Sequence, residues 1–109
     1  MKLAIHTLPA VMNTSVNTVL QLTVSNHPGV MSHVMGLFAR RGFNVDGILC
    51  LPLPDPSLSG IWLRVREDSR LEQVIRQIQK LADVREVRRH SAGHGVFQEL
   101  ERFFAEQAA

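Results

Sequence analysis

The spacing of apolar residues switches along this chain between a two-residue period and a helical period, and this succession restricts the possible folds most. Residues 18–25 alternate, which predicts a half-buried strand. An apolar stripe at helical spacing then runs from about Pro28 to about Arg41. Gly42 follows, and glycine is the residue expected just beyond a helix end. This part of the chain therefore predicts a strand followed by a helix.

The rest of the chain repeats the succession. The predicted elements are strands at 43–53, 61–66 and 84–89 and a second helix at 69–81. The breaker-rich stretch PDPSLSG separates the first two of these strands. Ser69 and Glu72 have the spacing of a capping box at the start of the second helix.

The order strand–helix–strand–strand–helix–strand predicts an α+β, ferredoxin-like βαββαβ fold. Its two strand–helix–strand units form a four-stranded antiparallel sheet with both helices on one face. At 109 residues the chain can form one domain. We expect a flexible leader at 1–17, the folded domain at 18–90, and a linker with a C-terminal amphipathic helix at 91–109. The apolar side of that last helix either folds back on its own sheet or docks on another protein.

Charge and composition argue against several classes of function. The formal net charge is +2, and the basic residues are dispersed, whereas nucleic-acid binding usually needs a dense patch. The apolar run at 45–53 is interrupted by Asp46, Gly47 and Pro52, so no membrane span is expected. The histidines are scattered, and no metal site is predicted. A single cysteine excludes an internal disulfide and favours a cytoplasmic protein.

The single cysteine, Cys50, lies in an apolar predicted strand. We expect it to be a small buried hydrophobic residue. No base is evident beside it in the sequence, so a nucleophilic role is not predicted.

The tetrapeptide Asn-His-Pro-Gly joins the first strand to the first helix. Pro28 suits the first helical position because it lacks an N–H group, and His27 is then expected to be the non-helical cap. The N–H groups of Gly29 and Val30 would point out of the helix start, where a carboxylate binds well. Asn26 adds an amide donor and an acceptor. This set of groups matches an α-amino acid, but a capped turn without a ligand is the alternative, because these are common turn residues.

Two long stretches carry a resemblance to a known family. LTVSNHPGVMSHVMGLFARRGFNVDGILCLPL, and then IWLRVREDSRLEQVIRQIQKLADV, resemble the small regulatory subunit of acetohydroxyacid synthase, also called acetolactate synthase. The resemblance is to the short type with a single ACT domain found in enterobacteria, and it runs from about residue 18 to about residue 104. It implies that the folded domain at 18–90 is an ACT domain, a module that binds amino acids in metabolic regulation.

The resemblance implies a non-catalytic chain without a cofactor of its own. Subunits of this family bind a catalytic large subunit, which carries thiamine diphosphate, Mg²⁺ and FAD. They raise its activity and confer feedback inhibition by valine in branched-chain amino acid biosynthesis. The resemblance also implies a homodimer whose ACT domains pair through edge strands, with the effector at the interface. The sequence leaves open the preferred branched-chain amino acid, its affinity, the stoichiometry with the large subunit and the role of the leader.

The family's effector-contacting positions fall on the loop described above. The resemblance places them at Asn26 and Gly29, together with the neighbouring backbone of His27, Pro28 and Val30.

Two further sets of contacts complete the expected site. The resemblance implies that Asn44 reaches the effector from the second copy of the chain. A valine side chain also needs a small apolar pocket, and Val30, Val34 and Ile48 are the expected walls, since each should lie close to the loop in the predicted fold.

An RNA-binding module is the alternative function, because the same order of elements serves RNA recognition. That function needs exposed aromatic residues on the central strands. The first strand has none, and the third offers only Trp62. A small hydrolase of the acylphosphatase type would need a phosphate-binding arginine in the loop, and residues 25–29 contain no arginine.

Overall fold

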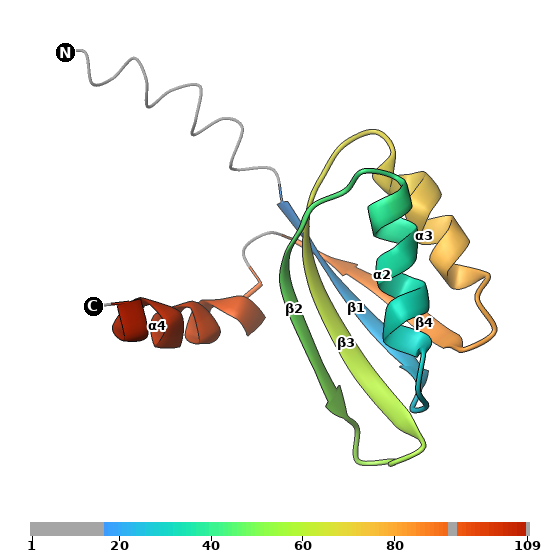
Figure 1. Cartoon of the computed structure of the whole chain (residues 1–109), viewed down its shortest axis with the longest axis horizontal. Helices are drawn as coiled ribbons and strands as arrows, with labels where there is room; N and C mark the ends of the chain where they lie inside the picture. Colours follow the sequence, from blue (N-terminus) through green and yellow to red (C-terminus); the bar gives the residue numbers. More distant parts are fainter. Residues whose placement is uncertain (1–16, 92–93, 109) are drawn as a thin grey trace.

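Four antiparallel strands form one sheet, and two helices cover one of its faces (Figure 1). The computed structural model describes residues 17–91 and 94–108. The elements are β1 (Asn17–Ser25), α2 (Val30–Arg40), β2 (Val45–Pro52), β3 (Leu58–Arg66), α3 (Leu71–Gln79), β4 (Val84–His90) and α4 (Val96–Ala108). This order confirms the predicted βαββαβ fold with an added C-terminal helix. Apart from Asn17, which begins β1, the predicted leader lies outside the described residues.

The strand order is β2-β3-β1-β4, so β1 and β3 are central and β2 and β4 are edge strands. The alternation read from the sequence decides which side chains are buried. Residues of β1 and β3 that face α2 and α3 form the core with the apolar stripes of these two helices. The fully buried side chains include Leu20, Leu22, Val24, Ile61, Leu63, Val65, Val34, Phe38, Val74 and Ile78. No described helix is both long enough and apolar enough to cross a membrane.

The end of α2 is closed by a Schellman motif. The Gly42 N–H donates to the Ala39 carbonyl at 3.1 Å, and the Phe43 N–H donates to the Phe38 carbonyl at 2.9 Å. Gly42 has φ 76, as expected for a left-handed residue after a helix. The Phe38 and Phe43 rings pack edge to face, with centroids 6.0 Å apart. Because Phe43 completes this motif, β2 begins only at Val45, later than predicted.

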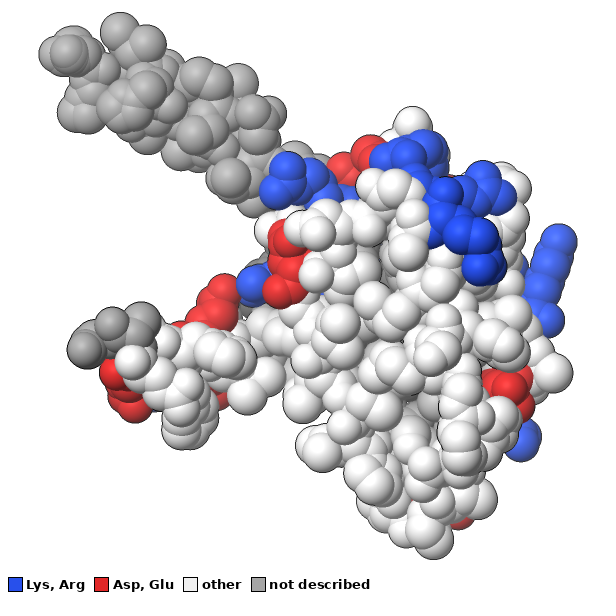
Figure 2. Space-filling view, viewed as in Figure 1, with Lys and Arg blue, Asp and Glu red and all other residues white. Residues whose placement is uncertain are grey.

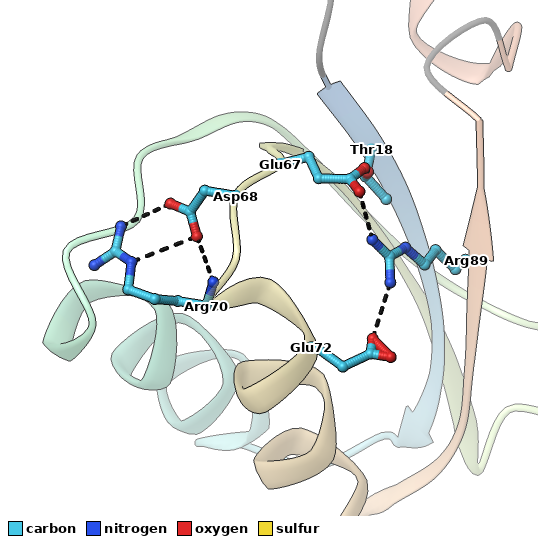
Figure 3. A network of polar contacts seen from close by, with 6 residues as sticks. All are labelled: Thr18, Glu67, Asp68, Arg70, Glu72 and Arg89. Atoms are coloured by element: carbon cyan, nitrogen blue, oxygen red, sulfur yellow. Dashed lines mark hydrogen bonds and ion pairs between the residues drawn. The ribbon is translucent and has the colours of Figure 1, made fainter.

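The predicted capping box of α3 is wrong. The helix begins at Leu71, and the side chain of its N-cap residue, Arg70, makes no capping hydrogen bond. Asp68 instead closes the preceding turn, because its Oδ1 accepts the Arg70 N–H at 2.7 Å and its carbonyl accepts the Leu71 N–H at 3.1 Å. Asp68 also pairs with the Arg70 guanidinium (Figure 3), and this hydrogen bond lowers the pKa of the Asp68 carboxyl.

A second polar cluster connects α3 to β4 and β1 at one end of the sheet (Figure 3). Arg89 of β4 contacts Glu67, just after β3, at 2.9 Å and Glu72 of α3 at 3.0 Å. Glu67 also accepts a hydrogen bond from the Thr18 hydroxyl of β1. Exposed ion pairs contribute little singly, but this arrangement joins three elements.

Two glycines, one inside α2 and one just beyond its end, should respond to substitution by alanine with opposite signs. Gly42→Ala should lower the free energy of unfolding by about 1 kcal/mol, because alanine is strained at positive φ. Gly36→Ala should raise it by about 0.5–1 kcal/mol, because Gly36 lies inside the helix. The added Cβ would meet only the end of the flexible Arg40 side chain, at 3.3 Å. Urea unfolding measures both values, and equal effects of the two substitutions would contradict the assigned cap.

Candidate binding site at the start of α2

The Asn-His-Pro-Gly loop lies at one end of the sheet, beside the turn between β2 and β3 (Figure 1). The Ser25 N–H donates to the Asp83 carbonyl and the Asn26 N–H to the Ser57 carbonyl, both at 2.8 Å. The Asn26 Nδ2 donates to the Pro56 carbonyl at 2.9 Å. These bonds hold the loop against two other turns and leave the Asn26 Oδ1 as the acceptor of that side chain.

The start of α2 differs from the prediction. The helix begins at Val30, and Gly29 is its N-cap, with φ 94 and ψ −17 in the left-handed region. Glycine adopts this conformation without steric cost because it has no Cβ atom. The prediction that Pro28 occupies the first helical position and that His27 is the cap is therefore wrong. Pro28 belongs to the turn before the helix, and Gly29 turns the chain into it.

The first turn of α2 keeps free backbone donors. No side chain caps it, and it contains no acidic residue. In the part of the chain that the structure describes, no backbone hydrogen bond engages the N–H of Gly29 or Val30. A Cβ atom built on Gly29 would meet no heavy atom within 4 Å, so the space there is open. These donors and the positive end of the helix dipole can bind a carboxylate together.

A small cavity of about 70 Å³ opens beside the loop. It is bounded by Val24, Ser25, Asn26, His27, Val30, Met31, Cys50, Ser59 and Ile61. Most of these residues are apolar or small, and the polar groups gather at the loop. Such a combination suits a ligand with a small aliphatic side chain and one charged end.

The loop residues predicted from the sequence gather at this cavity. Asn26, His27 and Val30 line it, and Pro28 and Gly29 belong to the same loop.

Sequence reasoning missed six of the nine lining residues: Val24, Ser25, Met31, Cys50, Ser59 and Ile61. Met31 follows Val30 in the first turn of α2, and Cys50 pairs with Ile61 across β2 and β3. The register of the hairpin was the signal that could have placed Cys50 there, because cross-strand partners lie on the same face of a sheet.

Val34 and Ile48 do not line this cavity, contrary to expectation. Val34 lies one turn further along α2 and is fully buried in the core. Ile48 pairs with Leu63 in the middle of the strand ladder and is 50% exposed. It borders a second cavity of about 190 Å³ between β2 and α4. Only the end of β2 passes the loop, so a residue in its middle is too far along the strand.

Asn44 lies at the opposite end of the sheet from the loop. It precedes Val45, which pairs with Val65, whereas the loop adjoins the end of β1 at Ser25, which pairs with Leu58. The Asn44 side chain donates to Asp46 at 2.7 Å. Within one chain the structure therefore does not bring Asn44 to the loop.

The His27 ring makes two polar contacts. Its Nε2 lies 2.7 Å from Oδ1 of Asp83, and its Nδ1 lies 2.7 Å from the Pro28 carbonyl oxygen. The hydrogen bond to Asp83 raises the pKa of His27, and the Pro28 carbonyl raises it further.

Comparison with known proteins assigns this fold and loop to one family. Residues 20–86 match the family described as the AHAS small subunit-like ACT domain. The chain belongs to this family. The chain is 58% identical over 88 residues to the acetolactate synthase isozyme 1 small subunit of Escherichia coli strain K12, covering 81% of this chain and 92% of that one. It is 35% identical to the isozyme 3 small subunit of the same strain, covering 75% of this chain and 51% of that one.

Solved structures agree with this assignment. The crystal structure of the acetolactate synthase small subunit from Thermotoga maritima aligns with a TM-score of 0.60 and 29% identity, covering 81% of this chain and 68% of that one. The ACT domain from the GTP pyrophosphokinase of Chlorobium tepidum aligns with a TM-score of 0.56 and 13% identity, covering 69% and 97%. The second likeness supports the fold alone.

The two edges of the ACT sheet differ in character. On β4, the exposed side chains include Arg85, Glu86, Arg88 and Arg89. On β2, the exposed residues include Ile48, Leu51 and Cys50. The prediction that Cys50 is buried is wrong because β2 has a neighbour on one side only. Figure 2 shows this contrast in part, since the face over β2 and the lower ends of β2 and β3 is largely uncharged.

The first half of the final helix is anchored to the sheet. Phe97 is 5% exposed and lies against Gly47 of β2, where an added Cβ would come within 2.9 Å of its ring. Arg64 stacks over the Phe97 ring at 5.5 Å and pairs with Glu101 at 2.7 Å. Beyond this point α4 points away from the sheet (Figure 1), and Phe103 and Phe104 are 62% and 71% exposed. The first half of α4 therefore folds against its own sheet, whereas docking of the outer half on another protein stays a prediction.

Trp62 lies on the sheet face opposite α2 and α3, but it is not a free stacking platform. Its ring stacks on His90 with centroids 5.5 Å apart and lies 4.9 Å from the His94 ring. His90 also contacts the Gln21 side chain at 2.9 Å. The aromatic residue on which the RNA-binding alternative depends is therefore engaged within the chain.

Proposed function

We propose that this protein is the regulatory small subunit of an acetolactate synthase, and that it binds valine in the loop before α2. It activates the catalytic large subunit and, when valine is bound, inhibits it in branched-chain amino acid biosynthesis. The observation that carries the proposal is the pair of free backbone donors at Gly29 and Val30, beside a small apolar cavity, in a chain of this family. The protein works in the cytoplasm and needs no cofactor of its own, because thiamine diphosphate, Mg²⁺ and FAD belong to the catalytic subunit.

Each part of the amino acid has a partner in this proposal. The carboxylate accepts hydrogen bonds from the Gly29 and Val30 N–H groups at the positive end of α2. The ammonium donates to Oδ1 of Asn26, the atom that the Pro56 contact leaves available. The isopropyl group enters the cavity between Val30 and Cys50. Because the cavity is small, we expect aliphatic side chains to be preferred to aromatic ones.

Gly29→Asp should weaken valine binding about 100-fold, because its carboxylate occupies the space of the ligand's carboxylate and repels it. Gly29→Ala is the matched control, since it imposes the same left-handed strain without a charge. It should weaken binding less than about tenfold. Calorimetric titration with valine, leucine and isoleucine measures the affinities and ranks the ligands. Unchanged binding by Gly29→Asp would contradict the assigned site.

The site is completed by a second copy of the chain in this proposal. The unpaired edge of β2 carries exposed apolar residues, whereas charged residues protect the edge of β4. Antiparallel pairing of two β2 strands would bring the start of one strand to the end of the other. Asn44 of one copy would then approach the loop of its partner, which explains how a residue at the far end of the sheet can contact the effector.

A bridging ligand gives a physical route to regulation. Valine that contacts both copies stabilises one arrangement of the dimer over others. The catalytic subunit would be less active with that arrangement, and a coupling free energy of about 1–3 kcal/mol would be ordinary for such a system.

Ile48→Lys should convert the dimer to a monomer and abolish valine binding, since a charge in the middle of an apolar edge blocks strand pairing. Glu86→Lys, on the other edge strand, is the control and should leave the dimer intact. Sedimentation velocity measures the oligomeric state and calorimetry the binding. A dimer that survives Ile48→Lys but is lost with Glu86→Lys would place the interface on β4 instead.

The outer half of α4 is the proposed contact with the catalytic subunit. Phe103 and Phe104 are exposed on a helix whose first turn is fixed by Phe97. An amphipathic helix held at one end can lay its apolar side in a groove of a partner.

Replacing both Phe103 and Phe104 by Ser should reduce activation of the catalytic subunit at least tenfold, a loss in keeping with two buried aromatic anchors. Valine binding should be unchanged, because neither residue borders the loop cavity. Glu106→Gln, on the same helix, is the control for a general surface effect. Full activation by the double variant would show that the helix does not make this contact.

A further inference from the structure

The His27 ring lies between two oxygen atoms that can only accept hydrogen bonds. Its Nε2 faces the Asp83 carboxylate and its Nδ1 faces the Pro28 carbonyl, each at 2.7 Å. A neutral imidazole has one N–H group and one acceptor nitrogen, whereas the protonated ring has two N–H groups. Both contacts are therefore satisfied together only when the ring is protonated and Asp83 is ionised.

The contact between the His27 ring and the Pro28 carbonyl determines the direction of the Gly29 N–H, one of the two proposed donors to the ligand. The Pro28 carbonyl and the Gly29 N–H belong to the same peptide unit, and every described peptide bond is trans. In a trans peptide these two groups point in opposite directions. When His27 holds the carbonyl on one side, the Gly29 N–H is directed to the other side, away from the ring. Rotation of this peptide plane is otherwise easy, because glycine tolerates many backbone conformations.

Asp83 connects this contact to the rigid sheet. It immediately precedes Val84 of β4, and its carbonyl accepts the Ser25 N–H at 2.8 Å, at the end of β1. The carboxylate that holds His27 is thus fixed to two paired strands, and the loop is held from the sheet side.

We propose that His27, held by Asp83, is a positioning residue that directs the Gly29 N–H at the effector's carboxylate, so that binding is strongest when the imidazole is protonated. The inference rests on the proposed function, since it concerns the same loop. A neutral ring can keep only one of its two hydrogen bonds. Loss of the bond to the Pro28 carbonyl frees the Pro28–Gly29 peptide, and loss of the bond to Asp83 detaches the ring from the sheet.

Other charged or titratable groups lie on the elements that hold the loop. Arg85 of β4 contacts the Ser25 hydroxyl at 3.5 Å. Asp55 lies in the turn that packs on Asn26, and its hydrogen bonds with Ser57 lower its pKa. His33, in the second turn of α2, is exposed and donates its N–H to Gly29.

The sign of the pH dependence follows from the direction of the shift. The pKa of His27 is raised above 6.5, first by Asp83 and then by the Pro28 carbonyl. The protonated, doubly bonded ring therefore predominates below 6.5 and is lost as the pH rises through the raised pKa. Valine should bind more tightly at pH 6.0 than at pH 8.5.

The test is calorimetric titration of the full chain with valine at pH 6.0 and pH 8.5. For the wild type we expect affinity to fall about three- to tenfold between these values, since a tenfold change corresponds to one pKa unit between free and bound states. His27→Gln should show less than a twofold change and resemble the wild type at pH 8.5. Asp83→Asn should move the midpoint of the dependence to lower pH. His33 is present in every variant, so the difference between the wild type and His27→Gln reports on His27 alone.

Amide NMR of the same variants without ligand separates the two proposals. In the wild type the Gly29 amide shift should titrate with the pKa of the His27 ring, and in His27→Gln it should not. A fall in affinity of equal size in His27→Gln, or a Gly29 amide that ignores the His27 titration, would overturn the positioning role. Absence of valine binding at either pH would overturn the proposed function, while the Gly29 titration would still report on the contact between His27 and Pro28.

Discussion

The left-handed backbone of Gly29 is the constraint on which the candidate site depends. It turns the chain from the end of β1 into α2 and leaves the first donors of the helix without partners. A residue with a side chain would be strained in this conformation, and its Cβ would project into the open space that a ligand needs. Asn26 and His27 hold the loop from two sides, through the turn before β3 and through the turn before β4. The site is therefore a backbone surface supported by side chains, and most of its specificity should come from geometry.

Much of the fold could be predicted from periodicity, because the apolar positions of β1, α2, β3 and α3 are also the positions that fill the core. The ends of the helices were harder. Pro28 and Ser69 have strong preferences for helix starts, yet Gly29 and Asp68 determine the two starts. Such local competition depends on which hydrogen bonds the neighbouring turns leave available, and that information lies outside the segment itself.

The candidate site was predictable in its loop and less so in its walls. The loop is one contiguous stretch with a recognisable sequence, so its residues necessarily lie together. The walls come from different elements, and their placement depends on strand register and strand order. Ile48 was expected beside the loop, but the register places Cys50 there. The prediction that Cys50 on β2 is buried failed for a related reason. An apolar strand at the edge of a sheet has the same sequence pattern as an internal strand.

The stacking of Trp62 on His90 and His94 has a practical consequence. Trp62 is the only tryptophan of the chain, so all indole emission comes from this one place. His90 ends β4, and His94 lies two residues before Val96, where the final helix begins. The intrinsic fluorescence of the protein is thus a native optical reporter on whether the His94 ring is packed against the sheet, available in any mixture whose other components lack that fluorophore.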